Sequence, residues 1–208
     1  MSRAKTKQPT LPMPEVLFEA PRTPDVVTVP ARKVLSIEGA GSPDGDAFAQ
    51  AIGALYGVAY TLKFARKFDG GTGFQIGPLE GRWWAKAGSP FPPPRDAWQW
   101  RLRIAVPSDV TAAELKRTIT AATTKKGGKL EGSVAARRVE LEKVPRQQLG
   151  RALHVGPYAD EPETFAKIDG LLREEGLRPG RSHLEVYLSD PRRTKPAKLK
   201  TVLLRELR

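Results

Sequence analysis

An internal repeat constrains the fold of this chain more than any other feature of its sequence. Residues 26–107 carry a Val29-Pro30 pair followed by a predicted strand, helix, strand and strand, and residues 134–208 repeat that order after Val144-Pro145. A predicted helix at residues 111–126 joins the halves. Two such units predict an α+β fold of duplicated β-α-β-β units. Their antiparallel sheet or sheets would carry helices on one side and a ligand groove on the other.

The predicted elements follow from hydrophobic periodicity and from turn residues. A capping box, Thr111 with Glu114 three residues later, marks the start of the joining helix. The helices are expected at residues 46–64, 111–124 and 161–175, and the strands at 26–29, 32–39, 79–85, 98–107, 134–144, 149–155, 183–190 and 200–207.

The predicted strand near the C-terminus alternates apolar and polar side chains. Leu184, Val186 and Leu188 would share one face, and Glu185 and Tyr187 would share the other, because successive strand side chains point to opposite sides. A carboxylate and a phenol would therefore lie together on one side of the sheet.

Composition excludes several classes of protein. The 208 residues contain no cysteine and two histidines, which excludes disulfides and thiolate sites and argues against a metal site or a cofactor held by such groups. No apolar run reaches the roughly 20 residues that a membrane helix needs. We expect a cytoplasmic protein with a proline-rich, extended arm at residues 1–25 and a single domain at residues 26–208. The net charge of +12 is spread among acidic residues, so nucleic acid is not expected as the main partner.

Several motifs resemble those of the GyrI-like small-molecule-binding family, in its stand-alone branch. The resemblance covers about residues 26–208. It is carried by residues 78–84 (PLEGRWW), 98–100 (WQW), 154–158 (HVGPY) and 185–194 (EVYLSDPRRT). It implies that Glu185 is the ligand-contacting glutamate. Some stand-alone members hydrolyse the cyclopropane ring of DNA-alkylating natural products, so the resemblance also implies a candidate hydrolase.

The repeat places Glu80 and Glu185 at corresponding positions, so both carboxylates are expected in the groove. Glu185, Glu80 and Tyr187 are the candidate catalytic residues, with a glutamate activating water and Tyr187 donating to the oxygen that gains charge. The candidate ligand-binding residues are Trp83, Trp84, Trp100, Tyr158 and Arg82.

Some choices stay open at this point. A bulge at Gly81 would bring Trp83 to the side of Glu80, whereas a regular strand would bring Trp84 there. Trp98 and Trp100 also suit a core beneath the helices. The alternative without a function in binding or catalysis is that Glu185 is a solvated strand carboxylate or forms a salt bridge to an arginine.

The sequence therefore predicts a binder of hydrophobic, polycyclic or cationic aromatic molecules, with hydrolysis of strained electrophiles as the candidate reaction. The alternative is a non-enzymatic module that binds a protein such as gyrase or a regulator. Because the repeat gives one chain two related halves, it removes one reason for a homodimer, and we expect a monomer.

Overall fold

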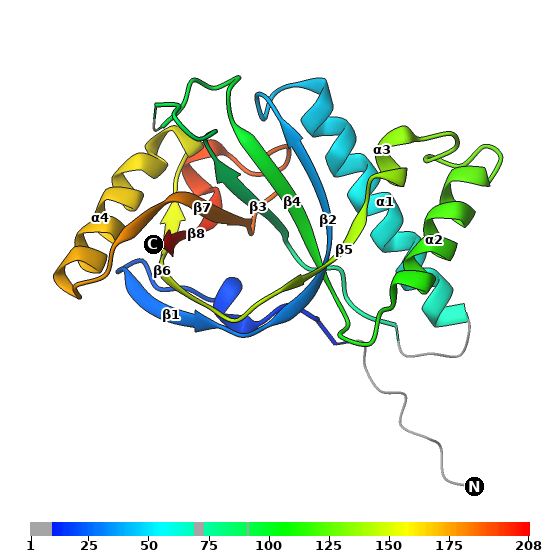
Figure 1. The fold of residues 1–208 in the computed structure, drawn as a ribbon, viewed down its shortest axis with the longest axis horizontal. Helices are drawn as coiled ribbons and strands as arrows, with labels where there is room; N and C mark the ends of the chain where they lie inside the picture. The colour runs from blue at the N-terminus through cyan, green and yellow to red at the C-terminus, as the bar shows by residue number, and fades with distance from the viewer. Residues whose placement is uncertain (1–9, 69–72, 91) are drawn as a thin grey trace, which may run out of the picture.

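The fold is described from a computed structural model, which places residues 10–68, 73–90 and 92–208 (Figure 1). The elements in chain order are η1 (Glu15–Leu17), β1 (Asp25–Val29), β2 (Arg32–Ala40), α1 (Asp46–Phe68), β3 (Leu79–Trp84), β4 (Gln99–Val106), α2 (Ala112–Thr124), α3 (Val134–Arg137), β5 (Glu140–Val144), β6 (Gln147–Val155), η2 (Tyr158–Asp160), α4 (Glu161–Glu174), β7 (Pro179–Tyr187), η3 (Pro196–Lys198) and β8 (Lys200–Leu207).

The predicted α+β class is confirmed. Eight strands form one antiparallel sheet in the order β1-β6-β8-β7-β3-β4-β2-β5. Each half keeps three of its own strands, and the halves exchange their first strands: β1 pairs with β6, and β5 pairs with β2. Proline lacks a backbone donor, and Pro30 and Pro145 lie where each exchanged strand gives way to the next. The two halves meet where β3 pairs with β7.

One predicted strand is wrong in part. Residues 134–144 read as a single strand, but Val134–Arg137 form the short helix α3 before β5 begins at Glu140. Ser133 caps this helix, since its hydroxyl accepts a hydrogen bond from the Ala136 amide at 3.2 Å. The capping box at Thr111 is confirmed, because the Thr111 hydroxyl accepts from the Glu114 amide at 3.2 Å.

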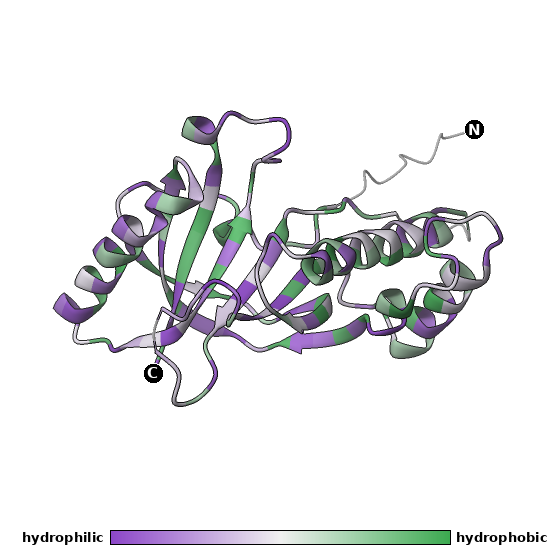
Figure 2. Ribbon diagram, turned by 90° about the horizontal axis from the view of Figure 1, so that it is seen from above, coloured by the Kyte–Doolittle hydropathy of each residue, from purple (hydrophilic) through white to green (hydrophobic). Residues whose placement is uncertain are grey.

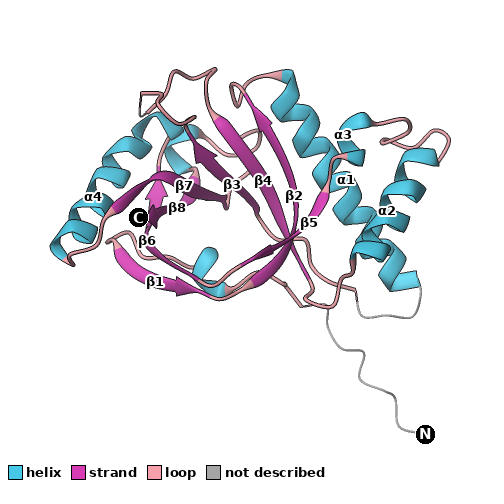
Figure 3. Ribbon diagram, viewed as in Figure 1, coloured by secondary structure: helices cyan, strands magenta, loops and turns pink. Residues whose placement is uncertain are grey.

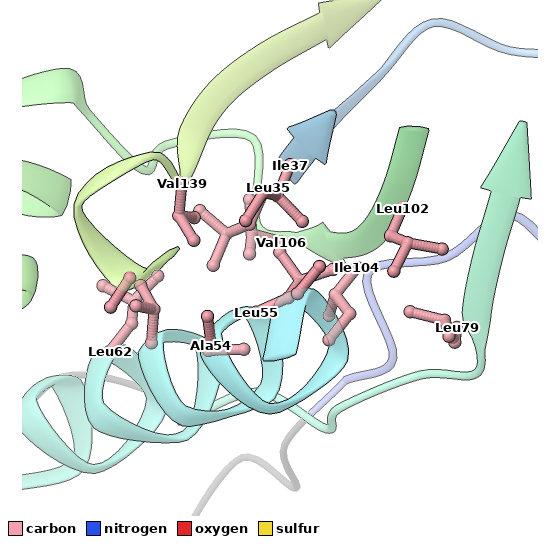
Figure 4. Close-up of a cluster of buried hydrophobic side chains, with 14 of the residues drawn as sticks. Leu35, Ile37, Ala54, Leu55, Leu62, Leu79, Leu102, Ile104, Val106 and Val139 are labelled. Carbon is pink, nitrogen blue, oxygen red and sulfur yellow. The ribbon is translucent and has the colours of Figure 1, made fainter. Parts of the chain in front are cut away.

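The helices lie in two groups at the two ends of the sheet, α1 to α3 at one end and α4 at the other (Figures 1 and 3). Helix α1 buries an apolar face, including Leu55 and Leu62, against β2 and β4 (Figure 4). Helix α4 buries Phe165, Ile168 and Leu172 against Ala152 of β6 and Leu203 of β8.

The opposite face of the sheet has its own apolar cluster. It contains Leu184 and Val186 of β7, and Met13 and Leu17 from the segment before β1 pack onto it. Both hydrophilic and hydrophobic residues occur along the strands (Figure 2). Residues 1–9 of the predicted arm lie outside the described part of the chain. Among the described residues, no helix combines the length and apolarity needed to cross a bilayer.

Candidate functional site

One row of paired residues across the sheet locates Glu185. Antiparallel partners point to the same face, and the register links Ala152, Leu203, Glu185, Gly81 and Leu102 in that order. The first two belong to the core under α4, and Leu102 belongs to the core under α1. Glu185 therefore lies on the helix-bearing face, between the two helical groups.

The face of the sheet on which Glu185 lies differs from the expected one. The sequence placed the groove on the face without helices, whereas Glu185 and Tyr187 share the face on which α1 and α4 pack. The physical reason is that α1 and α4 cover the two ends of the sheet and leave β3 and β7 between them.

Both oxygens of the Glu185 carboxylate have hydrogen-bond partners on its own strand. The Tyr187 hydroxyl donates to Oε2 at 2.6 Å, and His183 Nε2 lies 3.0 Å from Oε1, where it donates when it carries the proton. Trp83 Nε1 in turn donates to the Tyr187 oxygen at 3.2 Å. The strand alternation produces this arrangement, because residues two apart lie side by side on one face.

Aromatic rings surround this carboxylate. Trp98 meets both Trp83 and His183 edge to face, with centroids 6.1 and 5.5 Å apart, and Phe165 of α4 lies 4.6 Å from the His183 ring. Tyr158 contacts the Tyr187 ring at 6.1 Å and forms the outer rim, at 40% exposure. The Glu185 side chain is only 12% exposed. The carboxylate is thus set in apolar, weakly hydrated surroundings.

A second carboxyl group, Glu161, belongs to the same cluster, and the sequence reading did not single it out. Glu161 begins α4 and is 7% exposed. Burial, and next the charge of Glu185, raise the pKa of Glu161 to about 9, which the Thr201 hydroxyl partly offsets. The signal available in the sequence was a glutamate three residues after Tyr158, at the start of a helix.

The two tyrosines of the cluster are held in their neutral form. Burial, followed by the charge of Glu185, raises the pKa of Tyr187 well above its usual value. Burial and then the nearby Glu161 and Glu185 raise the pKa of Tyr158 to about 12. Both phenols therefore keep their protons at neutral pH.

Glu80 does not lie with Glu185, so the expected pair of carboxylates in one groove is wrong. Glu80 pairs with Val186, and Gly81 is the residue opposite Glu185. A shift of one residue reverses the face of a strand side chain. Glu80 therefore points to the other face, where it is fully buried and accepts a hydrogen bond from Arg32 Nη2 at 2.5 Å.

The candidate ligand-binding residues of β3 and β4 also lie on both faces of the sheet. Strand β3 has no bulge, so Trp83 faces the Glu185 side while Arg82 and Trp84 face the other. Arg82 forms a bidentate salt bridge with Glu206 at 2.8 Å and lies over the Trp84 ring at 5.0 Å. Trp100 is on the Glu185 side but is 1% exposed and packs against Phe48 of α1. It belongs to the core that supports the site.

Open hollows of the surface lie away from this cluster. One of about 510 Å³ is lined by residues of α2, and another of about 400 Å³ lies beside the turn between β5 and β6. The Glu185 cluster is the stronger candidate site, because it joins buried carboxyl groups to aromatic rings and the hollows do not. In the described ranges, no group of three or more His, Cys, Asp or Glu side chains is arranged to hold a metal ion.

Comparisons with known proteins identify the family and agree with the fold. The model of the GyrI-like small molecule binding domain matches residues 104–204. The crystal structure of an uncharacterized conserved protein from Listeria innocua is 34% identical, with a TM-score of 0.82 over 92% of this chain and 95% of that chain. The chain belongs to the GyrI-like family. A hydrolase from Listeria innocua is 32% identical, with a TM-score of 0.84 over 97% of this chain and 100% of that chain.

A more distant similarity concerns the fold alone. The crystal structure of the EcmrR C-terminal domain is 10% identical and has a TM-score of 0.55, over 89% of this chain and 96% of that chain. A search among curated proteins finds no match.

A glycine makes room for the hydrogen bonds around Glu185. A Cβ added at Gly81 would lie 2.8 Å from Trp83 Nε1 and 3.0 Å from the Tyr187 hydroxyl oxygen. We expect Gly81→Ala to displace the Tyr187 phenol and to lower the free energy of unfolding by about 1–3 kcal/mol, as overpacking does. Urea denaturation would measure this loss. Gly170→Ala is the control, because a Cβ there meets nothing within 4 Å. Equal stability of the two variants would contradict the crowded geometry.

Proposed function

We propose that this chain binds planar hydrophobic or cationic aromatic molecules between α1 and α4, with Glu185 as the group that contacts them. The proposal rests on one observation: a carboxylate that is 12% exposed stands among aromatic rings. Within the described part of the chain, no lysine or arginine forms a salt bridge with it. A ligand cation would place a positive charge beside this carboxylate, and in low-dielectric surroundings that attraction is strong.

The ligand class follows from the walls of the site. Trp83, Trp98, Phe165 and Tyr158 offer ring faces and edges, which favour flat aromatic systems. Positive charge on such a ligand would also be attracted by the ring faces. Because the side chains close over Glu185, entry of a planar molecule requires Tyr158, the exposed rim, to turn away.

The same carboxylate suits hydrolysis of strained electrophiles, such as cyclopropane-bearing genotoxins. In this reaction Glu185 takes a proton from a water molecule, and the water oxygen attacks the strained carbon. The Tyr187 hydroxyl donates a hydrogen bond to Glu185 at 2.6 Å, so the role of Tyr187 is to position Glu185. The sequence predicted instead that Tyr187 would donate a hydrogen bond to the substrate oxygen that gains charge. Two neighbours from Listeria innocua that are 32% identical are described as hydrolases, which supports this chemistry.

The test uses a spirocyclopropyl cyclohexadienone fused to a planar aromatic ring. The wild-type protein is mixed with this probe, and dienone absorbance and the thermal unfolding midpoint are followed. Hydrolysis predicts loss of the dienone above the buffer rate, with a ring-opened alcohol as product. A raised midpoint without turnover would support binding and not hydrolysis. The absence of both changes would contradict the proposal.

A protein-binding role is the second candidate, and one observation favours it. Helix α1 exposes a row of aromatic side chains, with Tyr60 at 44%, Phe64 at 48% and Phe68 at 82% exposure. Exposed apolar surface of this kind marks interaction sites in many proteins. Absence of any midpoint shift across a set of planar cationic and neutral aromatics would favour this role over the Glu185 site.

A further inference from the structure

Glu161 is a buried carboxyl group that the Glu185 reaction leaves without a role. It is 7% exposed, and its Oε1 has no hydrogen-bond partner among the described residues. A buried polar atom without a partner is costly for the fold. The helix N-terminus at which Glu161 lies would favour an anion, yet burial and the charge of Glu185 act in the opposite direction. The Glu161 carboxyl group is therefore protonated and neutral at neutral pH.

The ring-opening reaction needs a proton donor, and three of the polar groups near Glu185 are already engaged. Tyr187 donates to Glu185, and Trp83 donates to Tyr187. His183 Nε2 faces Glu185 Oε1. When a strained ring opens toward an oxygen, the electron pair that leaves carbon makes that oxygen basic, and it must be protonated or stabilised. None of these three groups can supply that proton without giving up its bond within the Glu185 network.

We propose that Glu161 is the general acid of this site and that it acts as the partner of Glu185. The proposal rests on the hydrolytic function proposed above. It assigns the two carboxyl groups opposite roles, with Glu185 as the base and Glu161 as the donor. Neighbouring carboxyl groups whose surroundings separate their protonation states form acid–base pairs in other hydrolytic sites.

The step balances for the spirocyclopropyl dienone probe. The water oxygen bonds to the cyclopropane methylene carbon, and one ring carbon–carbon bond breaks. That electron pair makes the six-membered ring aromatic, and the carbonyl oxygen becomes a phenol oxygen. The proton of water goes to Glu185, and the proton of Glu161 goes to the phenol oxygen. Transfer of the proton from Glu185 back to Glu161, directly or through solvent, restores both groups.

The pH dependence of the reaction reports on this assignment. Glu161 keeps its proton below a pKa of about 9 and loses it above, so the ring-opening rate should fall as the pH rises through about 9. Tyr158, Glu185 and Tyr187 lie within electrostatic range of Glu161. Further along α4, His154 contacts Thr164, and His183 and Arg205 contact the Phe165 ring. The pKa of Tyr158 is about 12 and that of Tyr187 is raised well above its usual value, so neither phenol accounts for a fall near pH 9.

The experiment compares Glu161→Gln with the wild-type protein in the dienone assay across pH. Glutamine keeps the shape of the side chain and cannot transfer a proton. We expect it to lower the ring-opening rate by about 10²-fold or more, the usual contribution of a general acid, and to remove the fall near pH 9. Binding of the ring-opened phenol product needs no proton transfer. The affinity of Glu161→Gln for this product should therefore stay within about threefold of that of the wild-type protein.

Two further variants make the result specific. Glu163→Gln changes an exposed glutamate in the same first turn of α4 and should leave the rate and the pH profile unchanged. Tyr158→Phe removes the other uncommitted proton near the site and should keep the fall near pH 9. A fall that disappears in Tyr158→Phe and persists in Glu161→Gln would overturn the assignment to Glu161.

The outcomes separate this inference from the function on which it rests. If the wild-type protein does not accelerate ring opening, the hydrolytic function fails and the role of Glu161 fails with it. If the wild-type protein opens the ring and Glu161→Gln does so within about threefold of its rate, only the role of Glu161 fails, since a general acid contributes far more. The wild-type profile needs no variant, and a rate that stays level through pH 10 would also overturn the inference.

Discussion

Arg32→Met should lower the free energy of unfolding by about 3–5 kcal/mol, although Arg32 lies far from Glu185. The Arg32 and Glu80 side chains are 3% and 0% exposed, and Nη2 of Arg32 lies 2.5 Å from Oε2 of Glu80. Removing the arginine leaves a carboxylate buried without its cation, which costs more than the loss of the contact itself. Chemical denaturation, followed by tryptophan fluorescence, measures the effect.

Two companion variants identify the cause of that loss. Arg32→Met combined with Glu80→Leu removes both charges, and its stability should return to within about 1 kcal/mol of wild type, because apolar residues replace buried ion pairs well. Arg95→Met breaks an exposed pair with Asp44, where the side chains are 66% and 72% exposed, and should change stability by less than about 1 kcal/mol. An effect of Arg32→Met as small as that of Arg95→Met would contradict the burial of this pair.

Glu185→Gln should weaken the binding of a planar aromatic cation by about 2–5 kcal/mol, or roughly 30-fold or more in the dissociation constant. The variant keeps the shape of the side chain and loses its charge, so the aromatic walls remain and the counter-ion does not. Binding of a neutral planar molecule of the same size should change much less, since stacking on Trp83 and Trp98 is unaffected. An equal loss for both molecules would show that the variant has disturbed the site.

Much of the fold could be predicted from the sequence because its signals are local. Strand alternation placed Leu184 and Val186 on one face and Glu185 on the other, as the structure does. The capping box at Thr111 located the start of α2. The repeated Val-Pro pairs led to the duplicated unit, since each proline falls between an exchanged strand and the strand that follows it.

Local sequence patterns could not predict which residues come together in the site. Leu-Glu pairs at Leu79-Glu80 and Leu184-Glu185 suggested equivalent glutamates, but the register opposes Gly81 to Glu185 and turns Glu80 to the other face. Register is set by the packing of whole strands, and an error of one residue reverses every side chain. Glu161 was missed for a related reason. Only the packing of α4 on the sheet brings its carboxyl group to Glu185.

The central claim is that ligands meet Glu185 on the helix-bearing face of the sheet, and calorimetric titration of N-methylacridinium tests it most directly. The comparison is between Glu185→Gln and Glu206→Gln. Glu206 has a similar side-chain exposure, 13% against 12%, but lies on the opposite face with Arg82. We predict that Glu185→Gln raises the dissociation constant roughly 30-fold or more and that Glu206→Gln leaves it nearly unchanged. Equal affinities for wild type and Glu185→Gln, or a loss confined to Glu206→Gln, would contradict the claim.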